Sequence, residues 1–168
     1  MSGRGIAFPQ IDRDQIHRFV QALFCHATGG YVQLRAFRDD ADGTWRSNDW
    51  PAVAMEAGID NLIDAAAKFA GQCASAREAV VFVPPVATFN DPQKAAEKNV
   101  DSGVSLSVDL DQKPTQARER LIAALGQPTV AVATGGEWVD PATGEVQPKV
   151  HLHWRLSSRL KLFLTTSR

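Results

Sequence analysis

The sequence predicts a mixed α/β (α+β) domain, because segments with helical spacing alternate with segments that have strand alternation. Residues 12–26 carry apolar side chains at i, i+3, i+4, i+7 and i+8, the spacing of an amphipathic helix. Residues 104–111 instead alternate apolar and polar side chains, as a strand with one buried face does. With 168 residues, 44% of them hydrophobic and 22% charged, the chain is long enough for one domain, or one domain with a small appendage.

The first half of the chain is predicted to contain two helices and two strands. Asp12 is placed to cap the helix at 12–26, and Gly29-Gly30 ends it. An alanine-rich second helix at 59–74 has its apolar side chains on one face. The other predicted segments are a strand at 31–37, a polar surface loop or hairpin tip at 38–51, a short buried strand at 79–83, and a loop with one or two helical turns at 86–102.

The second half of the chain is predicted to follow a βαβ order of elements. After the strand at 104–111, Pro114 is a favourable first-turn residue for a helix at 116–125, which Gly126 ends. The segments that follow are a strand at 129–133, an excursion of turn-forming residues at 135–148 that is typical of a β-hairpin, and a strand at 150–156.

Asp109 and Asp111 are the most informative pair of residues. Side chains at i and i+2 of a strand point to the same face, so both carboxylates emerge together at the strand's C-terminal end. Two like charges so close need a cation, and carboxylate oxygens are ligands that Mg²⁺ or Mn²⁺ accepts. Asp also favours turns, and Gln112-Lys113-Pro114 follows at once, so ordinary turn chemistry is an alternative.

His151, His153 and Arg155 share one face of the last predicted strand. Two histidines at this spacing can bind a metal, but a solvated or hydrogen-bonded face is the simpler interpretation. We expect Trp138 and Trp154 to serve packing, and the pair Gly135-Gly136 to form a turn. The basic residues near the end of the chain can contact phosphates or form a solvated terminus; they are Arg155, Arg159, Lys161 and Arg168.

Composition excludes several classes of protein. The net charge of −1 gives no global basic field, so nucleic-acid binding would depend on a local patch. Cys25 and Cys73 are isolated from each other in segments with helical spacing, so we expect them to be reduced thiols of a cytoplasmic protein. No apolar run approaches the length of a membrane span, and we expect no membrane partner.

The order of these motifs carries a resemblance to a known family. A strand that ends Asp109-x-Asp111 precedes a short helix, Gly135-Gly136, a hairpin excursion and His151-x-His153-Trp154. This order resembles the primase-polymerase domain of the archaeo-eukaryotic primase superfamily, most of all its plasmid- and phage-borne RepB-like and bifunctional branch. The resemblance covers nearly the whole chain. It implies an N-terminal α/β module at 1–100 and an RRM-like catalytic core at 101–168.

The resemblance also implies a function: a DNA primase/polymerase nucleotidyltransferase of plasmid or phage replication that works by two-metal phosphoryl transfer. Asp109 and Asp111 would hold Mg²⁺ or Mn²⁺, and His151 would contact the triphosphate of a nucleoside triphosphate. The further phosphate or template contacts that it implies are His153, Arg155, Lys149 and Arg35. The implied partners are a single-stranded DNA template and a replicative helicase.

One family feature has no counterpart. The family places a third carboxylate after the histidine strand, but no Asp or Glu follows Glu145 in this chain. The resemblance therefore implies a core that is truncated at its C-terminus. Two other functions stay open: an inactive, nucleic-acid-binding remnant of a primase, and a metal-dependent nuclease.

Overall fold

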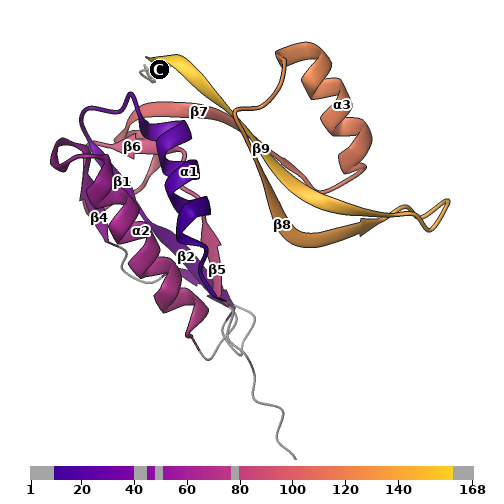
Figure 1. Ribbon diagram of the computed structural model, residues 1–168, viewed down its shortest axis with the longest axis horizontal. Helices are drawn as coiled ribbons and strands as arrows, with labels where there is room; N and C mark the ends of the chain where they lie inside the picture. Colours follow the sequence, from indigo (N-terminus) through magenta and orange to yellow (C-terminus); the bar gives the residue numbers. More distant parts are fainter. Residues whose placement is uncertain (1–9, 40–44, 48–50, 77–79, 161–168) are drawn as a thin grey trace, which may run out of the picture.

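The computed structural model describes residues 10–39, 45–47, 51–76 and 80–160, and it confirms the mixed α+β fold (Figure 1). The α-helices of this part are α1 (Arg13–Phe24), α2 (Ile59–Ala74) and α3 (Pro114–Leu125). Its strands are β1 (Tyr31–Gln33), β2 (Arg35–Asp39), β3 (Trp45–Ser47), β4 (Ala52–Ala54), β5 (Val80–Val83), β6 (Ala87–Phe89), β7 (Val100–Leu110), β8 (Val130–Val139) and β9 (Val146–Leu160). Short 3₁₀ helices, Met55–Ala57 and Glu97–Asn99, precede α2 and β7. None of the helices in this part combines the length and hydropathy needed to cross a membrane.

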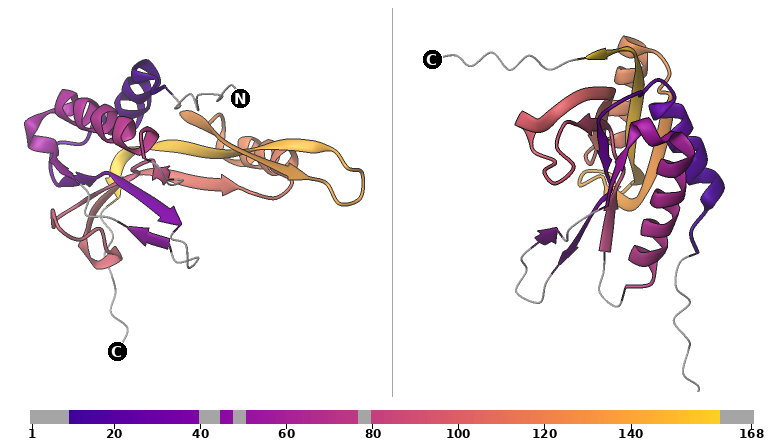
Figure 2. Two further views of the ribbon diagram at one scale, coloured as in Figure 1. Left: turned by 90° about the horizontal axis from the view of Figure 1, so that it is seen from below. Right: turned by 90° about the vertical axis from the view of Figure 1, so that its left-hand side faces the viewer.

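Six strands form one curled sheet in the order β4-β1-β6-β7-β9-β8, and all neighbouring pairs are antiparallel. β7 and β8 therefore run in the same direction on either side of β9, and α3 connects them. This arrangement is a split βαβ unit. The predicted βαβ order is therefore present, with β9 inserted between β7 and β8. The β8–β9 hairpin projects away from α1 and α2 (Figure 2). A second sheet has the order β3-β2-β5.

The main core lies under α1 and α2, which pack side by side (Figures 1 and 2). As the sequence predicts, Asp12 caps α1 by accepting a hydrogen bond from the backbone nitrogen of Gln15, at 3.0 Å. The amphipathic spacing of both helices places their apolar faces against the strands. The buried members of this core are Val20, Leu23, Phe24, Val32, Leu34, Ala36, Met55, Leu62, Ile63, Ala66, Phe69 and Val104.

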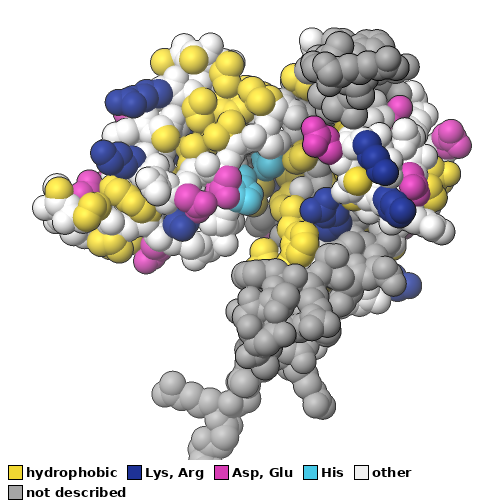
Figure 3. All heavy atoms as spheres, turned by 180° about the vertical axis from the view of Figure 1, so that it is seen from behind, with side chains coloured by type: hydrophobic (Ala, Val, Ile, Leu, Met, Phe, Trp, Pro, Cys, Tyr) yellow, Lys and Arg dark blue, Asp and Glu magenta, His cyan; other side chains and the backbone are white. Residues whose placement is uncertain are grey.

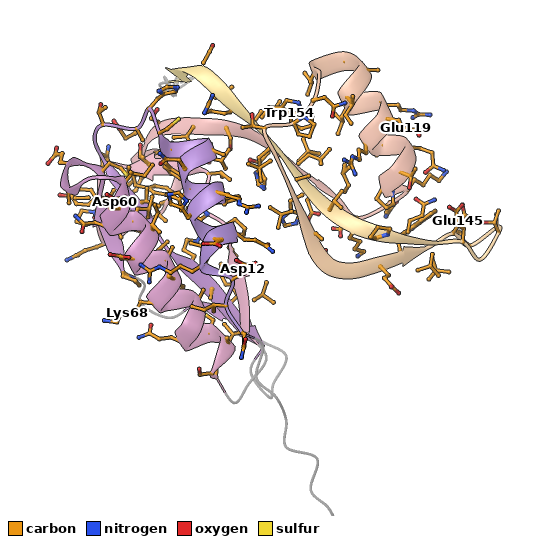
Figure 4. All side chains as sticks on the ribbon, in the orientation of Figure 1. Asp12, Asp60, Lys68, Glu119, Glu145 and Trp154 are labelled. Carbon is orange, nitrogen blue, oxygen red and sulfur yellow. The ribbon has the colours of Figure 1, made fainter. Side chains whose placement is uncertain are left out.

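A smaller core joins α3 to β7 and β9. Leu110, Leu152 and Trp154 are buried there, and half-buried side chains from the same elements surround them: Val108, Ala117, Leu121 and Val150. Trp154 lies on the α3 side of β9 (Figure 4), and its indole Nε1 donates a hydrogen bond to the Gly126 carbonyl at 3.0 Å. The prediction that Trp154 serves packing is confirmed.

The predicted strands differ from the observed ones in extent. The strand at 31–37 divides at Leu34 into β1 and β2, which join different sheets. The segment at 86–102, predicted as a loop, contains β6 and the start of β7 as well as a 3₁₀ turn. β8 and β9 extend beyond the predicted bounds, so the hairpin loop is shorter than residues 135–148. Within the predicted loop at 38–51, residues 45–47 form β3, and residues 40–44 and 48–50 lie outside the described part.

Two further predictions concern organisation. The predicted module boundary at residues 100 and 101 falls at the start of β7, and the six-stranded sheet includes strands from both sides of it. Cys25 and Cys73 are free cysteines, as predicted.

Candidate functional site

The pairing of β7 with β9 brings the predicted carboxylates and histidine together. Asp109 lies opposite His151 in the antiparallel register, and the Asp109 Oδ1 is 3.0 Å from the His151 Nε2. Two residues further along each chain segment, the Lys149 Nζ is 3.0 Å from the Asp111 Oδ1. The Asp side chains are 52% and 60% exposed, whereas those of Lys149 and His151 are each 31% exposed. The cluster is thus open to solvent and pairs each of two carboxylates with one basic group.

The chain folds this way locally because one face of each strand is apolar. Leu110 and Leu152 point into the small core under α3, and alternation turns Asp109 and His151 to the opposite face. β7 ends at Leu110, so Asp111 stands at the beginning of the turn into α3. The prediction that the Asp109 side chain emerges opposite the apolar residues is confirmed for Val108 and Leu110, whereas Val104, at the start of the predicted strand, packs in the main core.

The same face continues into a hydrogen-bonded chain that ends at a buried histidine. The Ser105 Oγ lies 2.9 Å from the Ser107 Oγ, which in turn lies 2.8 Å from the His153 Nδ1. His153 is 3% exposed, and the Phe19 ring of α1 meets its ring edge-on with 5.5 Å between centroids. Burial lowers the pKa of His153, and the charge of His151 lowers that pKa further. We name the residues of this face the polar ladder: Ser105, Ser107, Asp109, Asp111, Lys149, His151 and His153.

His153 is too deeply buried to contact a ligand at the surface. Its Nε2 is buried and has no hydrogen-bond partner among the described residues. A phosphate cannot reach this nitrogen without movement of the surrounding groups, so His153 is not a surface contact for a nucleotide in this conformation. The centroid of its ring lies 6.3 Å from that of the His151 ring, so His153 packs beside His151.

Two of the predicted phosphate contacts lie away from the carboxylates. The Arg155 guanidinium donates a hydrogen bond to the Ala22 carbonyl at 3.1 Å and lies 3.1 Å from the Cys25 Sγ, so it holds the end of α1 against β9. Arg35 belongs to β2 in the other sheet, where its guanidinium lies over the Phe37 ring. Among the other predicted basic residues, Lys161, Arg168 and the side chain of Arg159 lie outside the described part.

Sequence reasoning missed the contribution of Gly136 and Ser107. Gly135-Gly136 is not a simple turn: the β8–β9 register shifts between Ala133 and Glu137, which makes a bulge beside Lys149. A Cβ on Gly136 would lie 3.2 Å from the Lys149 Cδ, so glycine leaves room for the lysine that meets Asp111. Ser107 could have been found from the sequence, because it stands two residues before Asp109 on the same strand face.

The donor set at the ladder suits a hard cation in part. Within residues 10–160, gaps excepted, no group of three or more His, Cys, Asp or Glu side chains is arranged to hold a metal ion. Asp109 and Asp111 supply carboxylate oxygens, which Mg²⁺ and Mn²⁺ accept together with water and phosphate oxygens. The residues present therefore fit an ion that is shared with an anionic ligand.

Histidine and acidic side chains meet at a hollow in the surface. Figure 3 shows histidine side chains at a hollow between two parts of the molecule, with acidic side chains next to them. Comparisons with protein-family models, with curated proteins and with solved structures found no match to this chain.

Proposed function

We propose that this chain is a nucleotidyltransferase of the DNA primase/polymerase type, acting through divalent cations at the polar ladder. The observation that carries the proposal is the contact of Asp109 with His151 across β7 and β9, with Asp111 and Lys149 beside it. Two carboxylates that share a face with an imidazole and an ammonium group match the needs of phosphoryl transfer, where both metal charge and phosphate charge must be stabilised.

Each residue has a separate task in the proposed reaction. Asp109 and Asp111 would hold Mg²⁺ or Mn²⁺ through their carboxylate oxygens, and a bound ion would supply positive charge to the triphosphate and to the attacking hydroxyl. His151 donates a hydrogen bond to a phosphate oxygen as negative charge develops on the leaving pyrophosphate. Lys149 supplies a positive charge from the same strand.

His153 acts as a positioning residue in this proposal. Its ring is fixed by Ser107 on one side and by Phe19 on another, and it packs near the His151 ring. Arg155 and Arg35 are left out of the proposed contact set, because their guanidinium groups are engaged elsewhere. The template strand, a helicase partner and an origin in plasmid or phage replication remain predictions from the family resemblance.

A nucleotide-incorporation assay tests the proposal. The purified chain is given Mn²⁺ or Mg²⁺, the four deoxynucleoside or ribonucleoside triphosphates and single-stranded DNA, with and without a primer. We expect extension or dinucleotide synthesis, and we expect Asp109→Asn and His151→Ala each to lower it by at least about 10²-fold. Asp60→Asn is the matched control, because Asp60 lies on α2 away from the hairpin (Figure 4).

The same assay separates the proposal from its rivals. Degradation of the DNA without any incorporation would indicate a nuclease. Binding of Mn²⁺ and nucleotide without turnover would indicate a nucleic-acid-binding remnant, a second candidate favoured because no group of three or more His, Cys, Asp or Glu side chains in the described part is arranged to hold a metal ion. Incorporation that survives Asp109→Asn unchanged would contradict the assignment of the site.

A further inference from the structure

A cleft of about 520 Å³ is lined by residues outside the polar ladder and has no role in the proposal above. It lies between α1, Pro84-Pro85 and the first half of β8. Apolar side chains form most of its walls, among them Phe19, Val130 and Val132. Polar groups are fewer, and they come from Gln15, Arg18 and Thr129. A concave site of this size, mainly apolar with a few polar groups, is typical of sites that bind small molecules.

The strand register connects this cleft to the ladder. Val132 lies directly opposite His151 in the β8–β9 pairing, and Val130 lies opposite His153. The Cβ atoms of directly opposed residues are about 5 Å apart and point to the same face. Asp109 is one further strand away, which adds about 5 Å. A ligand held at His151 is therefore immediately beside the apolar wall.

We infer that this cleft holds the nucleoside part of the nucleotide whose triphosphate is bound at the polar ladder. This inference rests on the proposed function and names a substrate subsite for it. The match of charge carries the argument, because the anionic end of a nucleoside triphosphate would meet Lys149, His151 and a cation that Asp109 and Asp111 would hold. The base of the nucleotide has flat apolar faces and polar edges. The cleft likewise combines apolar walls with a few polar groups. Phe19 offers a ring for base contact.

The test compares two anions on one protein. Binding of dATP and of inorganic tripolyphosphate, each with Mn²⁺, is measured calorimetrically on the full chain. Tripolyphosphate occupies the ladder alone, whereas dATP also fills the cleft, so the wild type is expected to bind dATP roughly tenfold more tightly. Val132→Phe fills the cleft and is expected to remove that advantage while changing tripolyphosphate binding by less than about twofold.

Val139→Phe is the matched control, because Val139 is on the same strand but is 56% exposed near the hairpin end. It should leave both affinities unchanged. Equal affinity of the wild type for the two anions, or an equal effect of Val132→Phe on both, overturns the inference and leaves the proposed function standing. If neither anion binds with Mn²⁺, the proposed function fails and the inference with it.

A second measurement needs no variant and so does not depend on the folding of one. Photo-crosslinking with 8-azido-dATP and Mn²⁺, followed by peptide mapping, is expected to label residues 15–22 or 129–133. Excess tripolyphosphate should suppress this labelling, because it competes at the ladder. Labelling that is confined to other segments overturns the inference. Labelling of residues 129–133 that persists without Mn²⁺ and in excess tripolyphosphate also overturns it, since the cleft would then bind its ligand independently of the ladder.

Discussion

Leu152→Ala is expected to destabilise the fold strongly, because Leu152 is fully buried in the small core under α3. The substitution removes three carbon groups, and at about 0.8 kcal/mol for each the transfer cost alone is about 2.4 kcal/mol. A cavity among Leu110, Trp154 and Leu121 adds to this cost, so the free energy of unfolding should fall by about 3 to 4 kcal/mol. For a chain of 168 residues this corresponds to a drop in Tm of roughly 6–16 °C.

Equilibrium unfolding in urea measures this effect, with an unchanged m-value as the sign that the unfolded state is the same. Leu106→Ala is the matched control, because Leu106 lies on β7 but is 45% exposed. It should cost less than about 1 kcal/mol. If Leu152→Ala costs no more than Leu106→Ala, then α3 is not packed on β7 and β9 as described.

Two further predictions concern stability. Burial lowers the pKa of His153 below its ordinary value of 6.5, so the unfolded chain binds the proton more readily; the free energy of unfolding should therefore decline as the pH falls below 6.5. Urea unfolding between about pH 5 and pH 7.5 measures this decline. The free energy of unfolding should depend less steeply on pH for His153→Gln than for the wild type or for His26→Gln. Equal slopes for the three proteins would show that His153 is not the cause of the decline. Gly30 has a φ of +77° and a Cβ there would lie 3.1 Å from the Phe89 carbonyl oxygen, so Gly30→Ala should cost about 2 kcal/mol. Gly29→Ala has nothing within 4 Å of its Cβ and should be nearly neutral in the same measurement.

The elements that the sequence predicts best are those whose determinants are local. α1 and α2 follow from helical spacing and short-range end signals, and the Asp12 cap needs only the backbone nitrogen of Gln15 three residues later. The face of β7 that carries Asp109 follows from alternation within the strand itself. These features would be recognised in any chain with the same segment.

Features that depend on distant partners were not predictable. Nothing within residues 31–39 shows that the strand changes sheets at Leu34, since that depends on where β4 and β5 pair. β6 has three residues, which is too few for alternation to be read. The burial of His153 depends on Phe19, which belongs to the first helix of the chain. A histidine on a polar strand face therefore looks exposed in the sequence and is not.

The small core and the candidate site constrain each other through the strand register. If β9 slipped by one residue against β7, Leu152 and Trp154 would turn toward the polar face, and the buried apolar contacts under α3 would be lost. A slip by two residues would keep the faces but would place Lys149 or His153 opposite Asp109 instead of His151. The contacts of Ser107 with His153 and of Lys149 with Asp111 oppose that slip from both sides of the Asp109–His151 pair. The geometry that the proposed chemistry needs is thus fixed by apolar residues on one face of the sheet and by polar neighbours on the other.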